Sequence, residues 1–423
     1  MPEEKDIKDR IHAMGAQAVE AARLLAQLPA ETKNRILSAM ADGLVAASDE
    51  ILEANQIDLE EGRKKGLSSA LLDRLALDAD RVAAIADAIR KVATLPDPVG
   101  ESLARWARPN GIEIEKIRVP IGVIGIIYES RPNVTSDAAV LCFKSGNATI
   151  LRGGSEAIHS NRAIAAALQQ SGAVAGLPEN AIQLIPFTDR ESVRHMAEMD
   201  QYLDLIIPRG GQSLIETVVS LARMPVIKHY DGICHTYVHR HADPEMATRI
   251  TLDAKTQKPS VCNALETLLV DREIAPTFLP MLGKGLREKG VEIRGDARTC
   301  EILGPDVIAA TEQDWDTEYL DLILAIRVVD DLDAALQHIH EHSSQHSDCI
   351  VTSDADAAQA FMAGIDSAAV FWNVSTRFSD GEEFGFGAEI GISTDKLHAR
   401  GPMALPELTS YKYLVVGNGQ TKA

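Results

Sequence analysis

The sequence predicts an α/β protein with two domains, and three observations carry this prediction. The chain of 423 residues is longer than the roughly 250–300 residues at which a single hydrophobic core stops growing. From Val119 onward, β-prone and helical segments alternate, which is typical of a parallel sheet covered by helices. The alternation is interrupted after Met224 and resumes at Pro244, so we expect a second α/β region there.

The first quarter of the chain is predicted to be helical. Between residues 5 and 95, apolar side chains recur at three- and four-residue spacing, and a last helix over residues 80–92 is expected to end at a proline-rich stop. Residues 112–118 then alternate apolar and charged side chains after an Asn-Gly turn, which indicates a half-exposed strand.

The first α/β region contains two glycine turns of the same kind. Its strands are expected at 119–128, 147–152, 181–186 and 203–208, and its helices at 134–145, 155–171, 189–199 and 212–223. The second and fourth strands each end in Arg-Gly-Gly before a helix. Backbone N–H groups at such a helix start attract phosphate, and arginine adds a bidentate partner. The pair indicates a dinucleotide site, although the chain lacks a GxGxxG fingerprint here.

The second region is organised around Cys262. Helices are expected at 244–255, 273–288 and 331–342, and strands at 264–270, 291–295, 321–329 and 348–352. Cys262 therefore lies on a loop, preceded by Lys255 and Lys258, whose charges favour a thiolate. The alternative is an inert buried thiol, as Cys142 and Cys349 are expected to be. A loop rich in glycine and aromatic residues follows at 371–391, and a β-prone strand at 408–416 closes the chain.

Composition excludes several classes of protein. A formal net charge of −20 argues against nucleic acid or an anionic membrane as partner. Five scattered cysteines without a CxxC pair predict neither a disulfide framework nor a cysteine zinc site, and no metal is expected. The sequence begins without a signal-peptide core and holds no apolar run of membrane length. We therefore expect a cytoplasmic enzyme.

Several motifs together resemble the aldehyde dehydrogenase superfamily, and the resemblance covers nearly the whole chain. They are PIGVIGIIYESRPNVTSDAA, KSGNATILRGGSEA, PRGGQSLI, KHYDGICHTYV, QKPSVCNALETLLV, EYLDLILAI and WNVSTRFSDGEEFGFGAEIGIST. The resemblance implies two α/β domains and a small β oligomerisation flap. The cofactor domain would span 1–233, with 372–405 packing back on it, the catalytic domain 234–371, and the flap 109–120 and 406–423.

The motifs are most similar to those of superfamily members that reduce L-glutamyl 5-phosphate to L-glutamate 5-semialdehyde and phosphate with NADPH, in proline biosynthesis. This implies that the Cys262 thiolate attacks the acyl phosphate and forms a thioester. His229 stands where hydrolytic members carry a glutamate base, so phosphate rather than water is the expected partner of the thioester. Arg131 replaces an asparagine that holds the oxyanion, a role that passes to Asn133 or to the backbone N–H of Cys262.

The resemblance also assigns binding residues. Arg152 would contact the adenosine ribose and its 2′-phosphate, and Glu318 the nicotinamide ribose. Arg377 and Ser379 are candidates for the substrate's α-carboxylate, on charge and location alone. The full set of cofactor residues is Arg152, Gly153, Gly154, Ser155, Arg209, Gly210, Gly211 and Glu318.

Expected partners are a second copy of the chain, in a dimer or a dimer of dimers, and a glutamate 5-kinase that hands over the labile acyl phosphate. Two other functions stay open. An acylating aldehyde dehydrogenase that uses coenzyme A or another acyl phosphate would share the fold and the thiol. A cysteine hydrolase or amidotransferase, with His229 or His235 as base, would need no nucleotide.

Overall fold

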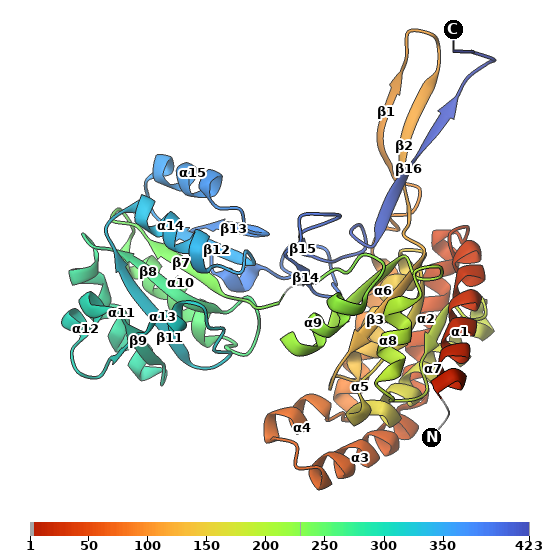
Figure 1. Ribbon diagram of the computed structural model, residues 1–423, viewed down its shortest axis with the longest axis horizontal. Coiled ribbons are helices and arrows are strands. Elements are labelled where there is room, and N and C mark those ends of the chain that lie inside the picture. The colour runs from red at the N-terminus through yellow and green to blue at the C-terminus, as the bar shows by residue number, and fades with distance from the viewer. Residues whose placement is uncertain (1–3, 229, 423) are drawn as a thin grey trace. The chain divides into compact units, whose positions relative to one another are not determined.

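The computed structural model describes residues 4–228 and 230–422, and they form two compact units (Figure 1). The first unit runs to Lys228 and includes Gly385–Gly391 and the chain from Met403 onward. The second unit extends to Phe384 and includes Ile392–Pro402. The C-terminal fifth of the chain is therefore divided between the two units.

A four-stranded parallel sheet is the centre of the first unit, in the order β5-β4-β3-β6. Its strands are β3 (Val123–Tyr128), β4 (Ala148–Arg152), β5 (Ile182–Leu184) and β6 (Leu205–Arg209). The connections are α6 (Asn133–Lys144), η1 (Ser155–Ala157) with α7 (Ile158–Ala175), and α8 (Glu191–Glu198), and α9 (Gln212–Leu221) follows β6. The chain adds β4 and β5 on one side of β3 and then returns to its other side, so the order reverses between β3 and β6. Open α/β sheets bind ligands at this switch point, beyond the carboxyl ends of the strands.

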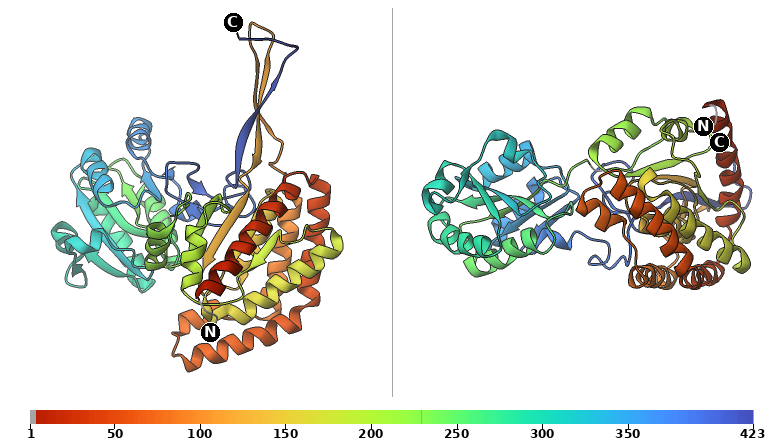
Figure 2. Two further views of the ribbon diagram at one scale, coloured as in Figure 1. Left: turned by 45° about the vertical axis from the view of Figure 1, so that its right-hand side comes forward. Right: turned by 90° about the horizontal axis from the view of Figure 1, so that it is seen from below.

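Five N-terminal helices complete the body of this unit. They are α1 (Glu4–Leu25), α2 (Ala30–Ala46), α3 (Ser48–Lys64), α4 (Ser69–Leu75) and α5 (Ala79–Thr94). The helix α1 packs on β4 and α8, whereas α2 packs against α5 and α7 (Figure 2). Each helix buries one apolar stripe, as the three- and four-residue spacing predicts; in α2 the stripe includes Ile36, Met40 and Leu44.

A separate antiparallel sheet projects from the first unit (Figure 1). We call it the flap; it consists of β1 (Ser102–Ala107), β2 (Glu113–Pro120) and β16 (Thr409–Val416), with β2 in the centre. Most side chains of β1 and β16 are exposed. The strands β1 and β16 form the two edges of this sheet.

A seven-stranded parallel sheet forms the second unit, in the order β10-β9-β11-β8-β7-β12-β13. Its strands are β7 (Cys234–Val238), β8 (Leu265–Asp271), β9 (Glu292–Gly295), β10 (Ile308–Ala309), β11 (Ile323–Val329), β12 (Ser347–Val351) and β13 (Ala369–Trp372). On one face lie α10 (Pro244–Thr256), α11 (Ala275–Glu288) and α12 (Ala297–Leu303). On the other lie α14 (Leu332–His342) and α15 (Ala355–Gly364). Short elements complete the unit: α13 (Glu312–Trp315), η2 (Thr376–Phe378) and the pair β14 (Ile392–Ser393) and β15 (Gly401–Pro402).

Two expectations about elements need correction. The strand expected over 119–128 is two strands, because the chain turns at Gly122, whose φ of 136° favours glycine. The Val123 N–H is donated to Asp204 Oδ2 at this turn, over 2.8 Å. The second difference is that several short elements were not predicted, among them β1, β7, β10, β13, α12 and α15. The strand β7, for example, is buried throughout, so its sequence shows no alternation.

No helix in the described part of the chain is both long and apolar enough to span a membrane.

Candidate active site

Cys262 lies in a turn between α10 and β8, at the amino end of the second sheet, and is half-buried. A hydrogen bond from β7 holds its backbone: the Cys234 thiol donates to the Cys262 carbonyl over 3.2 Å. A Cβ on Gly232 would overlap the Cys262 backbone, so only glycine lets the two segments approach this closely. The thiol-bearing turn is thus packed against the chain that leads into β7.

Asn263 fastens the same turn to the loop that contains Arg377 and Ser379. Its side-chain Nδ2 donates to the carbonyls of Ser379 (3.0 Å) and Arg377 (3.3 Å). The Thr376 hydroxyl returns a hydrogen bond to the Asn263 carbonyl over 2.8 Å. The Arg377 side chain lies on the same surface, where its Nε donates to Gln257 Oε1 over 2.9 Å. The structure therefore brings both proposed substrate residues to the turn that carries the thiol.

Glu318 joins this group through Gly232. The Gly232 N–H donates to the Glu318 carboxylate, and this hydrogen bond opposes the effect of burial, which raises the pKa of Glu318. Because Gly232 also packs on Cys262, one glycine positions both the carboxylate and the thiol. Sequence separation between Glu318 and Cys262 gave no hint of this arrangement.

Lys255 does not supply the free positive charge expected beside the thiol. Its ammonium is fully buried and pairs with Glu266 Oε2 over 2.6 Å. Burial lowers the pKa of Lys255 and raises the pKa of Glu266 to about 7. Glu266 Oε1 also accepts the Leu320 N–H over 3.3 Å, two residues from Glu318. The pair therefore joins α10 to β8 and, through Leu320, to the segment that contains Glu318.

The first unit presents its candidate site at the switch point between β3 and β6. Glu129 follows β3, and its Oε2 accepts the Gly211 N–H over 2.9 Å at the start of α9. A Cβ on Gly210 would overlap this carboxylate, whereas the space beside Gly211 is open. The Glu129 carboxylate thus lies at the helix N-terminus where the pyrophosphate was expected, a position that the helix dipole makes favourable for a negative charge.

Arg209, Arg131 and Asn133 surround the same strand ends. The Arg209 guanidinium lies under Gly391, where a Cβ would overlap it. Arg131 is exposed and follows Ser130, whose φ of 28° is unusual for a residue with a side chain. Asn133 begins α6 and donates from Nδ2 to Asp137 over 2.8 Å. Burial raises the pKa of Asp137 to about 6, although the Asn133 and Arg209 side chains oppose this rise.

The other glycine turn, residues 152–155, contains a buried arginine. Arg152 donates from Nη2 to the Thr188 carbonyl (3.0 Å) and from Nε to Ser192 Oγ (3.3 Å). Burial lowers the pKa of this guanidinium. In this structure Arg152 therefore holds the loop before α8. Gly153 allows a close approach, because a Cβ there would overlap the Asn161 side chain.

A cavity of about 370 Å³ opens beside Ser155. Its polar lining includes Lys65, Glu129, Ser130 and Glu156. Lys65 is exposed and paired with Glu61 over 3.1 Å. This lysine was missed in the sequence, because nothing in the local pattern separates it from the neighbouring basic residues at the end of α3.

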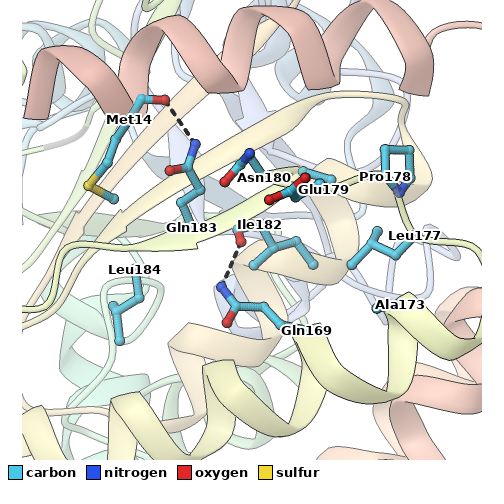
Figure 3. Close-up of a pocket in the computed structure, with 11 residues that line it drawn as sticks. Met14, Gln169, Ala173, Leu177, Pro178, Glu179, Asn180, Ile182, Gln183 and Leu184 are labelled. Carbon is cyan, nitrogen blue, oxygen red and sulfur yellow. Dashed lines mark hydrogen bonds between the residues drawn. The ribbon is translucent and has the colours of Figure 1, made fainter.

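A second cavity, of about 340 Å³, lies beside the edge strand β5 and contains none of the predicted site residues (Figure 3). Gln183 Nε2 donates to the Met14 carbonyl and Gln169 Nε2 to the Ile182 carbonyl, each over 2.8 Å. Both amides thus bond to backbone carbonyls of α1 and β5.

His229, the residue in place of the hydrolytic base, lies outside the described residues.

The predicted site residues form two groups, and each group lies within one unit. The second unit contains Cys262, Glu318, Arg377 and Ser379, and the first contains the Arg-Gly-Gly turns with Arg131 and Asn133. Sequence inspection missed Gly232 and Glu129. Glu129 directly follows β3 and Gly232 lies two residues before β7, and these positions next to strands were the available signal.

Comparison with known proteins places this arrangement in a family. Residues 4–305 match the aldehyde dehydrogenase family. A gamma-glutamyl phosphate reductase from Moorella thermoacetica is 56% identical over 412 residues, which cover 97% of this chain and 98% of that protein. One from Geobacter sp. is 53% identical over 416 residues, with 98% and 99% covered. The crystal structure of gamma-glutamyl phosphate reductase from Thermotoga maritima has a TM-score of 0.96 at 46% identity, covering 98% of this chain and 100% of that one. The chain therefore belongs to the aldehyde dehydrogenase family.

Proposed function

We propose that this protein is a gamma-glutamyl phosphate reductase, which converts L-glutamyl 5-phosphate to L-glutamate 5-semialdehyde and phosphate in proline biosynthesis. Relatives that carry this name are 53–56% identical over nearly the whole chain. The observation that carries the proposal is the turn at Cys262, where a half-buried thiol lies next to the loop of Arg377 and Ser379.

The chemistry divides into two steps at the Cys262 sulfur. The thiolate attacks the carbonyl carbon of the acyl phosphate; a C–S bond forms, the C–O bond to phosphate breaks, and phosphate leaves with the electron pair. When bound, a reduced nicotinamide supplies the hydride that converts the thioester to the aldehyde and restores the thiolate. Asn133 and the backbone N–H of Cys262 are the proposed donors to the developing oxyanion. Arg131 is proposed to bind the phosphate or carboxylate of the substrate.

Members of this family use nicotinamide cofactors, and we propose NADPH for this protein. The switch point of the first unit would hold the pyrophosphate at Gly210 and Gly211, with Arg209 as a charged partner. Arg152 and Ser155 are proposed to border the adenosine ribose, and Lys65, on the adjoining cavity, is proposed to pair with the 2′-phosphate. Glu318 is proposed to accept hydroxyls of the nicotinamide ribose.

The decisive test couples substrate supply to NADPH oxidation. Acyl phosphate formed in situ by a glutamate 5-kinase should support NADPH oxidation by the wild-type protein, and Cys262→Ser should abolish turnover while cofactor binding stays within a few-fold. Cys300→Ser is a matched control, because Cys300 is also half-buried but lies on α12. Oxidation that requires an acyl-coenzyme A instead would favour an acylating aldehyde dehydrogenase.

The reverse reaction tests whether water or phosphate resolves the thioester. With His229 in place of a carboxylate base, semialdehyde and NADP⁺ should give at most one NADPH per active site until phosphate or arsenate is added. Multiple turnovers without either anion would show that a group such as His229 activates water, and the protein would then be a hydrolytic dehydrogenase.

A further inference from the structure

The second unit has its own switch point, at the opposite edge of its sheet from Cys262. The helices α10 and α11 lie on one face and α14 and α15 on the other, so the winding reverses between β7 and β12, which are neighbours. Cys262 precedes β8 at the amino edge, whereas β7 and β12 end at the carboxyl edge. Parallel sheets present ligand-binding side chains at that carboxyl edge.

Two histidines and an aspartate meet at this point because the pairing of β7 and β12 continues beyond the strands. The His239 N–H donates to the Val351 carbonyl over 3.1 Å, and the Ser353 N–H donates to the His241 carbonyl over 2.9 Å. Arg240 and His241 form a turn, which the Ala242 N–H closes by donating to the His239 carbonyl over 2.9 Å. The rings of His239 and His241 lie with centroids 5.2 Å apart. Asp354, on the neighbouring segment, completes the group.

Two of the three side chains, His239 and Asp354, are oriented by hydrogen bonds to groups outside the trio. His239 Nδ1 lies 2.8 Å from Thr352 Oγ1. Asp354 Oδ1 accepts the N–H groups of Asp356 (3.0 Å) and Ala357 (3.1 Å), which leaves Oδ2 facing His241 Nδ1 at 3.2 Å. Such outer bonds hold metal ligands in place and select the free ring nitrogen. One ligand atom from each side chain lies within 4.8 Å of the other two.

We propose that His239, His241 and Asp354 bind a divalent transition-metal ion, with Zn²⁺ as its representative, that joins the segments after β7 and β12. Two imidazoles and a carboxylate suit late first-row cations and leave a fourth position for water. Two ligand atoms at about 2.0–2.2 Å from a tetrahedral zinc ion are roughly 3.4 Å apart. The distances among the three ligand atoms, which are within 4.8 Å here, must therefore shorten slightly on binding. The exposed side chain of His241 can make this movement.

The charges around the group are compatible with a cation. Arg240 stands between the two histidines in sequence, but its guanidinium pairs with Asp271, at 3.0 Å, and with Glu273. Burial lowers the pKa of His239, which favours the neutral ring that a metal needs. The N–H of Ala357 and the His241 side chain lower the pKa of Asp354, so the carboxylate is ionised. The site therefore offers one carboxylate and two imidazole rings as ligands.

The test is calorimetric titration of the full-length, tag-free protein with ZnCl₂ after treatment with a chelator. Wild type should bind one equivalent, and His241→Ala and Asp354→Asn should each weaken binding at least tenfold. Asn still caps α15, so the second variant removes the charge with little effect on folding. His340→Ala, at an exposed histidine of α14, is the matched control and should bind as wild type does.

Cys262 is a competing ligand, and a second measurement separates it from the proposed site. Co²⁺ bound to the wild type should give d–d bands without a thiolate charge-transfer band, and Cys262→Ser should retain the same spectrum. Thermal unfolding should shift upward with Zn²⁺ in wild type and not in His241→Ala. Zinc binding that survives both His241→Ala and Asp354→Asn, that disappears with Cys262→Ser, or that is absent from wild type would overturn the proposal.

Discussion

Glu129 occupies the place that a cofactor phosphate is proposed to take, so this residue should oppose binding. Glu129→Gln keeps an acceptor for the Gly211 N–H but removes a charge from the helix N-terminus. Removing a like charge near the pyrophosphate is worth about 1 kcal/mol, roughly fivefold in Kd. We therefore expect tighter NADP⁺ binding, measured by calorimetry. Glu216→Gln, an exposed acid on the same helix, should have no effect; weaker binding by Glu129→Gln would mean that the carboxylate contacts the cofactor itself.

Lys65 and Arg152 are both candidates for contacting the 2′-phosphate. Lys65 is paired with Glu61 at the surface, whereas Arg152 is bonded to the loop before α8. Lys65 is exposed and lines the cavity. Lys65→Met should therefore weaken the binding of NADPH by about 1 kcal/mol, the value of an exposed ion pair, and leave the binding of NADH unchanged. Lys64→Met is the control, at the adjacent exposed lysine.

Arg152 anchors the loop before α8, so we expect Arg152→Ala to weaken the binding of NADPH and of NADH by the same factor. A loss confined to NADPH would instead assign the 2′-phosphate to Arg152.

At the scale of elements, the buried ion pair between Lys255 on α10 and Glu266 on β8 supports the Cys262 turn. Lys255→Met leaves a buried carboxylate without its partner, which should lower the free energy of unfolding by about 3–5 kcal/mol. The double variant Lys255→Met with Glu266→Gln should lose less of the free energy of unfolding, because the amide oxygen of the introduced glutamine can still accept the Leu320 N–H and leaves no unpaired charge. Urea unfolding measures both. Equal losses would mean that packing, not charge, dominates.

The flap is the element proposed to join subunits. Val415 and Val416 on its edge strand β16 are 61% and 64% exposed, and Trp106 and Tyr413 pack against each other with ring centroids 6.1 Å apart. A sheet edge with this much apolar surface is expected to pair with a second copy. Val415→Lys with Tyr413→Glu should therefore lower the molecular mass measured by light scattering.

Val174→Lys is the control for the flap variants, because Val174 is 93% exposed on α7 and is not part of the flap. It should leave the mass unchanged. A wild-type protein that is monomeric at micromolar concentration, or flap variants that keep the wild-type mass, would contradict the proposed assembly.

At the scale of the whole molecule, buried histidines should make stability depend on pH. His338 accepts a hydrogen bond from Arg327 Nη1 at 2.9 Å through Nδ1, and burial lowers its pKa to about 2. Burial also lowers the pKa of His346 to about 4. The unfolded chain, with a histidine pKa near 6.5, binds more protons below that pH. The free energy of unfolding should therefore fall as pH decreases below about 6.5, by up to about 1.4 kcal/mol per pH unit for each histidine.

His338→Asn separates this effect from the titration of carboxylates. The amide oxygen can still accept from Arg327 but cannot be protonated, so the decline in stability between about pH 6.5 and pH 5 should become shallower, by an amount that approaches about 1.4 kcal/mol per pH unit near pH 5. His340→Asn, at an exposed position on the same helix, should leave the slope unchanged. Urea unfolding at several pH values provides the comparison, and an unaltered slope for His338→Asn would assign the pH dependence to other groups.

The sequence by itself determined the elements whose patterns are local. Apolar spacing located the long helices, and the predicted strand over 264–270 corresponds to β8 at Leu265–Asp271. Both Arg-Gly-Gly turns lie directly at strand ends, and Cys262 lies on a turn, as predicted. These features depend on side chains within a few residues of each other, so the order of residues contains the necessary information.

Only the tertiary structure decided which distant residues share a site. The placement of Gly232 beneath Cys262, the bond from Gly211 to Glu129 and the pairing of Lys255 with Glu266 each join segments that the sequence separates. His241 and Asp354 are 113 residues apart and meet because β7 and β12 are neighbours. Strand order arises from how helices cover the two faces of a sheet, a competition among buried surfaces that no local pattern records.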